Sequence, residues 1–264
     1  MLHQEITLIN HKMIMNEPIP EADKHCFMES ILSRCKSRND GSKDWSTKYN
    51  KAYPLQLLPT YEESQMERSK KLRLITGELP RTYLLSHHAY ELEALRLLAM
   101  WKIDDVEVVK LLERTEERLA DLSFDHLCGE DEWAGLSLVI LRFWNTYKLQ
   151  DIERMNKLLG NIIEHTFNNA QNMKKAPSYY LWLALSELAD KSEIVNEVIF
   201  KHSQDLYNLF QKGWIVNPHN ADRYNPIRKY IIKNALSKLP DFNYLKDAQV
   251  VMGSDGRCYG RPRP

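Results

Sequence analysis

Two apolar stretches decide the fold, residues 86–101 (SHHAYELEALRLLAMW) and residues 132–148 (EWAGLSLVILRFWNTYK). In each stretch the apolar side chains cover more than one face of a helix, which predicts a helix that is buried on two sides. Each is followed by a more polar segment, residues 104–122 and 149–167, with apolar residues three or four positions apart. The pattern predicts two successive helical hairpins, each made of a buried helix and a half-exposed one.

The same pattern extends toward both ends of the chain. Pro20 suits the first turn of a helix that would run to about residue 35, and Asn225-Pro226 suits the start of a helix that would end near residue 239. Residues 177–189 and 193–210 are predicted to form a third hairpin. We expect residues 1–18 to be extended or frayed, because their apolar pattern is weak.

The spacing between the hairpins is consistent with a repeat. Trp101 and Trp144 are 43 residues apart, and the Lys-Leu-Leu runs that begin at Lys110 and Lys157 are 47 apart. Helical-hairpin repeats of the HEAT or armadillo kind have periods of about 40–47 residues. We therefore predict an all-α fold of stacked antiparallel helical hairpins that form an α/α superhelix or partial toroid. The alternative is an irregular helical bundle.

Three segments are expected within what is in all one compact domain. Residues 1–82 would be an N-terminal helical and loop segment that packs on the main body. Residues 83–247 would be the hairpin repeat domain. Residues 248–264 are rich in Gly, Pro and Arg and are expected to form a flexible tail. The alternative is a basic peptide that folds over the body or a partner through Arg257, Arg261 and Arg263.

Composition narrows the class of protein. The 264 residues hold 36 Lys plus Arg and 36 Asp plus Glu, so there is none of the basic excess that nucleic-acid binding requires. No apolar run reaches the 18 residues of a membrane span, and the N-terminus does not resemble a signal peptide. The four scattered cysteines predict reduced thiols and a cytoplasmic location.

One candidate catalytic site would form where a loop meets a helix start. His87 and His88 share a helix face with Glu91, and the loop at residues 123–132 carries Asp125, His126 and Cys128. Stacked hairpins would bring this loop toward the two histidines, where the mixed donors could serve hydrolytic or metal-assisted chemistry. The alternative is an acidic loop beside an exposed helix start, where carboxylates favour the helix dipole. No motif requires a cofactor, and a metal cannot be assigned.

A second set of residues is predicted to bind a ligand. Most of the aromatic side chains are expected to pack in the core at helical spacing, but on a curved array some of them could line the concave surface, and the candidates are Trp101, Trp144, Tyr180 and Trp182. Arg142 lies in an apolar helix, and a buried arginine needs an acidic partner. The sequence thus predicts a helical repeat protein that binds a protein, peptide or small molecule in a groove, with an enzyme at the 123–132 loop as the alternative.

Overall fold

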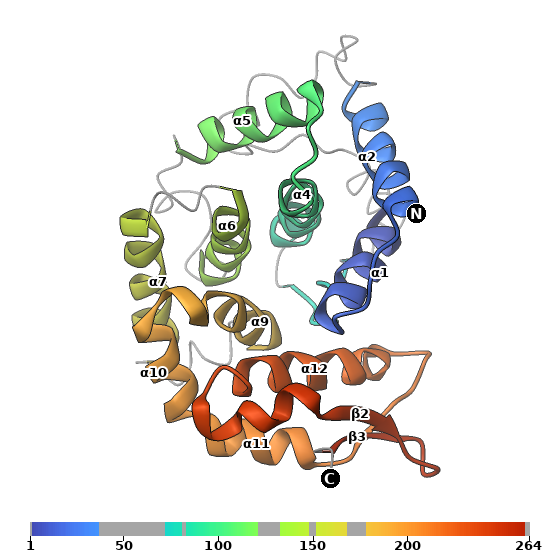
Figure 1. Ribbon diagram of the computed structural model, residues 1–264, viewed down its shortest axis with the longest axis vertical. Coiled ribbons are helices and arrows are strands. Elements are labelled where there is room, and N and C mark those ends of the chain that lie inside the picture. The colour runs from blue at the N-terminus through green and yellow to red at the C-terminus, as the bar shows by residue number, and fades with distance from the viewer. Residues whose placement is uncertain are drawn as a thin grey trace.

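The computed structural model describes residues 2–36, 72–80, 83–120, 133–147, 152–167 and 178–261. These residues are mostly helical, with one small sheet, so the predicted all-α class is confirmed (Figure 1). The α-helices are α1 (Leu2–Ile14), α2 (Glu21–Lys36), α4 (Tyr83–Met100), α5 (Val106–Ala120), α6 (Trp133–Tyr147), α7 (Ile152–Phe167), α9 (Ser178–Leu188), α10 (Glu193–Lys201), α11 (Ser203–Gln211) and α12 (Asn225–Leu236). Short 3₁₀ helices lie at η3 (Ala189–Lys191), η4 (Ala221–Tyr224) and η5 (Pro240–Asp247).

The helices form for the reasons that the sequence suggested. In α5 the Asp105 carboxylate accepts the backbone N–H groups of Glu107 and Val108, at 2.8 and 3.1 Å, and so caps the helix. This helix buries Val108, Leu112 and Leu119 on one side only. In contrast, every side chain from position 134 to position 145 of α6 is buried, because this helix has neighbours on several sides.

Four of the more buried helices pack on one another in chain order. Helix α4 packs on α6, α6 on α9, and α9 on α12, while α5, α7 and α11 pack on α4, α6 and α12 from outside (Figure 1). Helix α1 contacts both α4 and α12, the first and last of the four. Its Asn10 accepts a hydrogen bond from Arg96 of α4 at 2.6 Å, and its Ile14 carbonyl accepts one from Asn234 of α12 at 2.9 Å. Helices α4, α6, α9 and α12 thus form an inner row, and α1 contacts the first and the last of them.

The expectation for residues 1–18 was wrong, because residues 2–14 form helix α1. Leu2, Ile6, Ile9 and Ile14 are buried on one face at helical spacing. The stripe also includes Asn10, which is fully buried and donates to the carbonyl of Ile6 at 2.9 Å. That polar residue interrupts the apolar stripe, so the helical period was hard to see in the sequence.

The expectation of a flexible tail was wrong for residues 249–261. Strands β2 (Gln249–Met252) and β3 (Arg257–Arg261) form an antiparallel pair, and β3 also pairs with β1 (Trp214–Ile215). Cys258 and Gly260 of β3 are buried against the helices. A side chain at position 260 would overlap the Phe210 ring, since a Cβ there would lie 2.3 Å from it. The missing side chain lets the strand approach α11.

A buried lysine supports this C-terminal region. Lys229 of α12 is fully buried, and its ammonium donates to the backbone carbonyls of Leu209, Phe210 and Lys212 at 2.5–2.7 Å. These carbonyls lie at the C-terminal end of α11, where helical carbonyls lack helical partners. The ammonium also lies 4.1 Å from the centre of the Trp214 ring in β1.

None of the helices in the described part of the chain combines the length and the hydropathy that a membrane span needs.

Candidate functional site

The middle of the molecule holds a network of buried charges around Arg142. The guanidinium of this residue donates two hydrogen bonds of 2.8 Å to the two carboxylate oxygens of Glu187. It also donates to the Glu93 carboxylate and, at 3.1 Å, to the Tyr180 hydroxyl, which in turn donates to Glu93. Arg142 and Glu93 are each 1% exposed as side chains. The prediction that Arg142 has an acidic partner is therefore confirmed, and two carboxylates, Glu93 and Glu187, fill this role.

Arg96 extends this network toward α1. Its Nε donates to Glu93 at 3.0 Å, and its Nη1 lies 3.6 Å from Glu187. Its Nη2 donates to the buried amide oxygen of Asn10 at 2.6 Å. Two arginines thus face two carboxylates, and side chains of α1, α4, α6 and α9 meet at one point. Such a network holds the helices in a fixed register, because removing one member leaves the others buried without a partner.

Arg142 and Glu187 of this network are each stabilised in the charged form. Burial alone would lower the pKa of Arg142, but Glu187 and Glu93 raise this pKa well above its ordinary value. Burial would raise the pKa of Glu187, but Arg142 and Arg96 hold this pKa below its ordinary value. Burial, together with Glu93, raises the pKa of Tyr180 well above its ordinary value, so the phenol stays a hydrogen-bond donor.

Another carboxylate positions α9, the helix that carries Tyr180 and Glu187. Glu78 precedes α9 by a hundred residues in the chain and accepts the backbone N–H groups of Tyr179 and Tyr180 at 3.0 and 2.9 Å. The Thr76 hydroxyl donates to the same carboxylate at 2.8 Å. A carboxylate at a helix N-terminus satisfies N–H groups that have no helical partner and favours the helix dipole.

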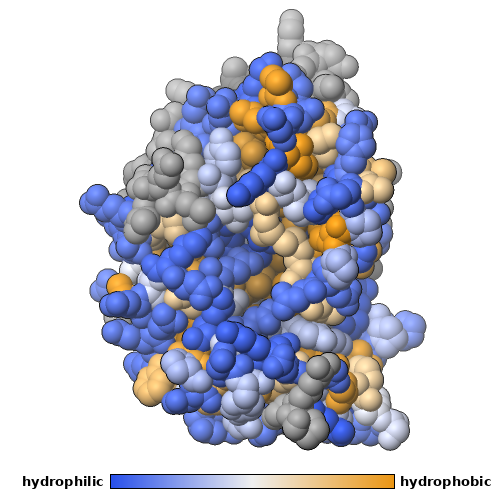
Figure 2. All heavy atoms as spheres, viewed as in Figure 1, coloured by the Kyte–Doolittle hydropathy of each residue, from blue (hydrophilic) through white to orange (hydrophobic). Residues whose placement is uncertain are grey.

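A pocket of about 460 Å³ opens beside the network. The pocket walls come from the C-terminal ends of α1, α4, α9 and α12 and from the segment that follows α12. The residues that line the pocket are therefore far apart in the chain. The face drawn in Figure 2 is hollowed between these helices, and hydrophilic side chains surround the hollow. The residues that line the pocket are Met13, Ile14, Asn16, Arg96, Met100, Leu183, Ser186, Glu187, Lys233, Asn234, Ser237, Lys238 and Lys246.

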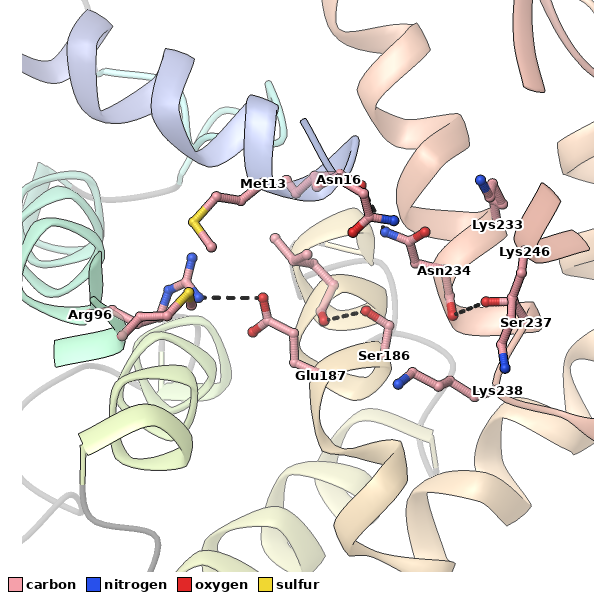
Figure 3. Close-up of a pocket in the computed structure, with 13 residues that line it drawn as sticks. Met13, Asn16, Arg96, Ser186, Glu187, Lys233, Asn234, Ser237, Lys238 and Lys246 are labelled. Atoms are coloured by element: carbon pink, nitrogen blue, oxygen red, sulfur yellow. Dashed lines mark hydrogen bonds and ion pairs between the residues drawn. The ribbon is translucent and has the colours of Figure 1, made fainter. Parts of the chain in front are cut away.

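The pocket has two unlike sides, as Figure 3 shows. Arg96, Glu187 and Met13 lie on one side, and Asn234, Ser237 and Lys246 lie on the other. Arg96 and Glu187 are the members of the buried network that line the pocket, and Glu187 has 28% of its side chain exposed. The first side therefore presents a carboxylate paired with a guanidinium, together with an apolar thioether, while the second side presents amide, hydroxyl and ammonium groups.

The predicted catalytic residues lie largely outside the described part of the structure. Asp125, His126 and Cys128 are not among the described residues, and for His87 and His88 only the backbone, within α4, is described. Glu91 is described, and it is 5% exposed on α4. Among the described residues there is no group of three His, Cys, Asp or Glu side chains that could hold a metal ion. The predicted convergence of the loop and the histidines stays a prediction.

The predicted ligand-binding residues are described, and they do not form one group. Only Arg142 and Tyr180 lie together, in the buried network. Trp101 contacts Phe27 of α2, with ring centres 5.6 Å apart, and Trp182 lies against Phe167 and His202. The Trp144 indole donates to Glu116 of α5 at 2.7 Å, and the Arg154 guanidinium lies 4.1 Å from the indole centre.

Sequence reasoning missed most of the residues that make the pocket. Arg96 stands among leucines of α4, and Glu187 lies near the end of the apolar run of α9, so each is a charged residue in a stretch predicted to be buried. The argument that singled out Arg142 applies equally to these two. Lys233, Lys238 and Lys246 carry no such signal, because they resemble solvated lysines until the fold brings them together.

Comparison with known proteins identifies no family for this chain. No family model, no curated protein and no solved structure matches the chain.

Proposed function

We propose that this protein binds a small ligand in the central pocket. The observation that carries the proposal is that four helices from both ends of the chain wall one pocket, beside a network of fully paired charges. Small-molecule sites are typically concave, with volumes of about 300–1,000 Å³ and a few fixed polar groups among apolar ones. The pocket matches this description in volume, whereas its lining is more polar, with four apolar residues among the thirteen. A pocket of this volume favours a small molecule over a peptide or protein.

The proposed architecture around the pocket is a short α/α superhelix. The C-terminal ends of α4, α9 and α12 line the same pocket, which fits a superhelix whose inner helices converge there, although α12 lies across the direction of α4 in Figure 1. Trp101 contacts α2 and Trp144 contacts α5, so each tryptophan meets the described outer helix that precedes its own hairpin. One difference counts against strict repetition, since Trp101 directly follows the end of α4, whereas Trp144 lies within the last turn of α6.

A cytoplasmic location goes with this proposal, because the cysteines are scattered and the two whose side chains are described, Cys26 and Cys258, are free. An enzyme with its site at the 123–132 loop remains the alternative.

Methionine methyl signals offer a direct test of ligand binding. Met13 and Met100 line the pocket, whereas Met28 is buried in the core and Met252 is exposed on β2. We expect that a screen of small neutral, cationic and anionic compounds against protein labelled with ¹³C at its nine methionine methyl groups will find compounds that shift Met13 and Met100 together. Met13→Leu and Met100→Leu assign the signals, and Met28 and Met252 serve as internal controls. The proposal fails if no compound shifts the pocket pair, or if every compound that does so shifts Met252 equally.

A further inference from the structure

The two edges of the small sheet differ in whether they have a partner within the chain. The strand order is β1-β3-β2, so β1 and β2 are the edge strands. The Val216 N–H donates to the Gly256 carbonyl at 3.0 Å, so the carbonyl of the preceding residue, Ile215, points away from β3. The side chain of Asn225 donates to this carbonyl at 2.7 Å. The edge at β1 is therefore capped by the chain itself.

The register of the hairpin shows that β2 has no such cap. The Gly253 N–H donates to the Arg257 carbonyl at 2.8 Å, and bonded and non-bonded pairs alternate along an antiparallel ladder. Val251 and Gly253 therefore bond to β3. The N–H and C=O groups of Val250 and Met252 point away from it, and none of the described residues forms a hydrogen bond with these outward groups.

The composition of β2 does not protect this edge either. Natural edge strands often carry a lysine, another charge or a proline, which discourages pairing with a second chain. Residues 249–253 (QVVMG) contain no charged residue and no proline. Val250 and Val251 are half-buried and Met252 is 57% exposed, in a hairpin at the end of the molecule opposite α5 (Figure 1). The strand thus offers unpaired backbone groups beside apolar side chains that are not fully covered.

From these features we infer that β2 pairs in antiparallel fashion with the β2 strand of a second copy of this chain, across a two-fold axis at Val251. In this register Val250 of each copy lies opposite Met252 of the other, so the outward groups form four hydrogen bonds. The two side chains of each such pair share one face, so Val250 covers the exposed Met252 of the other copy. Residue 251 lies opposite itself, on the face that points away from the helices.

Three observations favour a second copy over a strand of another protein. The strand supplies the residue that covers its own exposed methionine, and no charged residue within 249–253 meets a like charge across the axis. The formal net charge of the chain is zero, so two copies do not repel each other at long range. Because Asn225 caps β1, pairing through β2 closes at two copies instead of growing into a filament.

The short length of β2 supports the opposite expectation. The strand has four residues, and a very short edge strand is itself a device that prevents pairing. If this device is sufficient, the chain stays monomeric at every concentration. If it is not, we expect a weak dimer with a dissociation constant of about 100 µM, because interfaces that bury less than about 1,200 Å² are typically weak.

Sedimentation of the full chain from about 5 µM to about 1 mM separates the two expectations. We expect the wild type to shift from monomer to dimer over this range. Val251→Lys should weaken the dimer about fivefold or more, because it places two ammonium groups opposite each other. Ile215→Lys is the matched control, because this residue is also exposed on the face that points away from the helices but lies on β1. A wild type that stays monomeric, or a dimer that Val251→Lys leaves unchanged, overturns the inference.

Cross-linking tests the register itself and does not depend on how well the lysine variant folds. Residues opposite each other in a non-bonded antiparallel pair have Cα atoms about 4.5 Å apart, which lies within the range of disulfides. Val251→Cys should therefore form a disulfide-linked dimer under mild oxidation. The wild type and Ile215→Cys are the controls, because all three proteins share the exposed Cys26. Equal cross-linking of Val251→Cys and the controls would show that the two β2 strands do not meet at this residue, and the inference would be wrong.

Discussion

Arg142 and Lys229 are both buried cations, and the protein treats them differently. Arg142 faces two carboxylates, which raise its pKa well above the ordinary value. Lys229 faces three backbone carbonyls, and burial lowers its pKa to about 8, with a smaller opposing effect of Cys258. The difference shows that full negative charges fix a buried cation in its charged state, whereas carbonyl dipoles leave it able to lose a proton near neutral pH.

The largest effect is expected from Arg142→Met. Removal of the guanidinium leaves Glu93 buried beside Tyr180 with one cation, Arg96, in place of two, so we expect a loss of about 3–5 kcal/mol in the free energy of unfolding. Urea denaturation measures this loss, and Arg114→Met on the exposed face of α5 is the control, with an expected change within about 0.5 kcal/mol. Adding Glu93→Gln to Arg142→Met should cost less than the two single changes together. An additive double variant would contradict the coupled network.

A smaller loss is expected from Lys229→Met, about 2–3 kcal/mol. The methionine fills much of the same space but leaves the carbonyls at the end of α11 without their donor. The change should also loosen the contact between α11 and the sheet, so amide hydrogen exchange in β3 should quicken more than exchange in α4. Lys201→Met is the matched control. Equal protection of β3 in both variants would show that Lys229 does not support the sheet.

The comparison also predicts a pH dependence. The folded chain releases the Lys229 proton near pH 8, whereas the unfolded chain holds it to about pH 10.5. Between these values the unfolded chain binds more protons, so the stability of the wild-type protein rises with pH, by at most about 1.4 kcal/mol per pH unit from one group. We expect this rise in the difference between the wild type and Lys229→Met, in which contributions of other groups cancel. A difference that stays constant from pH 7 to pH 10 would place the pKa of Lys229 elsewhere.

The smallest effect is expected at a cation that is not buried. Lys238 pairs with Asp190, and the two side chains are 27% and 70% exposed. Asp190→Asn should lower the free energy of unfolding by less than about 0.5 kcal/mol, because solvent screens exposed ion pairs. Thermal denaturation at low and high salt measures this effect. A loss near that of Lys229→Met would mean that the protein does not distinguish buried from exposed cations in this way.

Particular residues show how much of the fold and of the pocket could be predicted from the sequence. Periodic apolar stripes predicted the helices from α4 to α7 to within a few residues, and an arginine inside an apolar helix predicted a buried ion pair. Asn10 concealed α1, because the partner that makes its burial favourable, Arg96, is 86 residues away. Strand β3 was missed because it contains Gly260, and glycine inside a strand usually weakens it. The folded structure shows that the Phe210 ring leaves no room for a side chain at this position. The pocket could not be predicted, since its lining includes lysines that only the fold brings together.

The position of α1 between α4 and α12 has a consequence for synthesis of the protein. Helix α1 is synthesised more than two hundred residues before one of its neighbours, α12. The part of its surface that contacts α12 therefore stays uncovered until that helix is made, and its packing on α12 is a late event that joins distant segments. A chain truncated before residue 225 would expose that face permanently, and we expect such a fragment to aggregate or to be captured by chaperones.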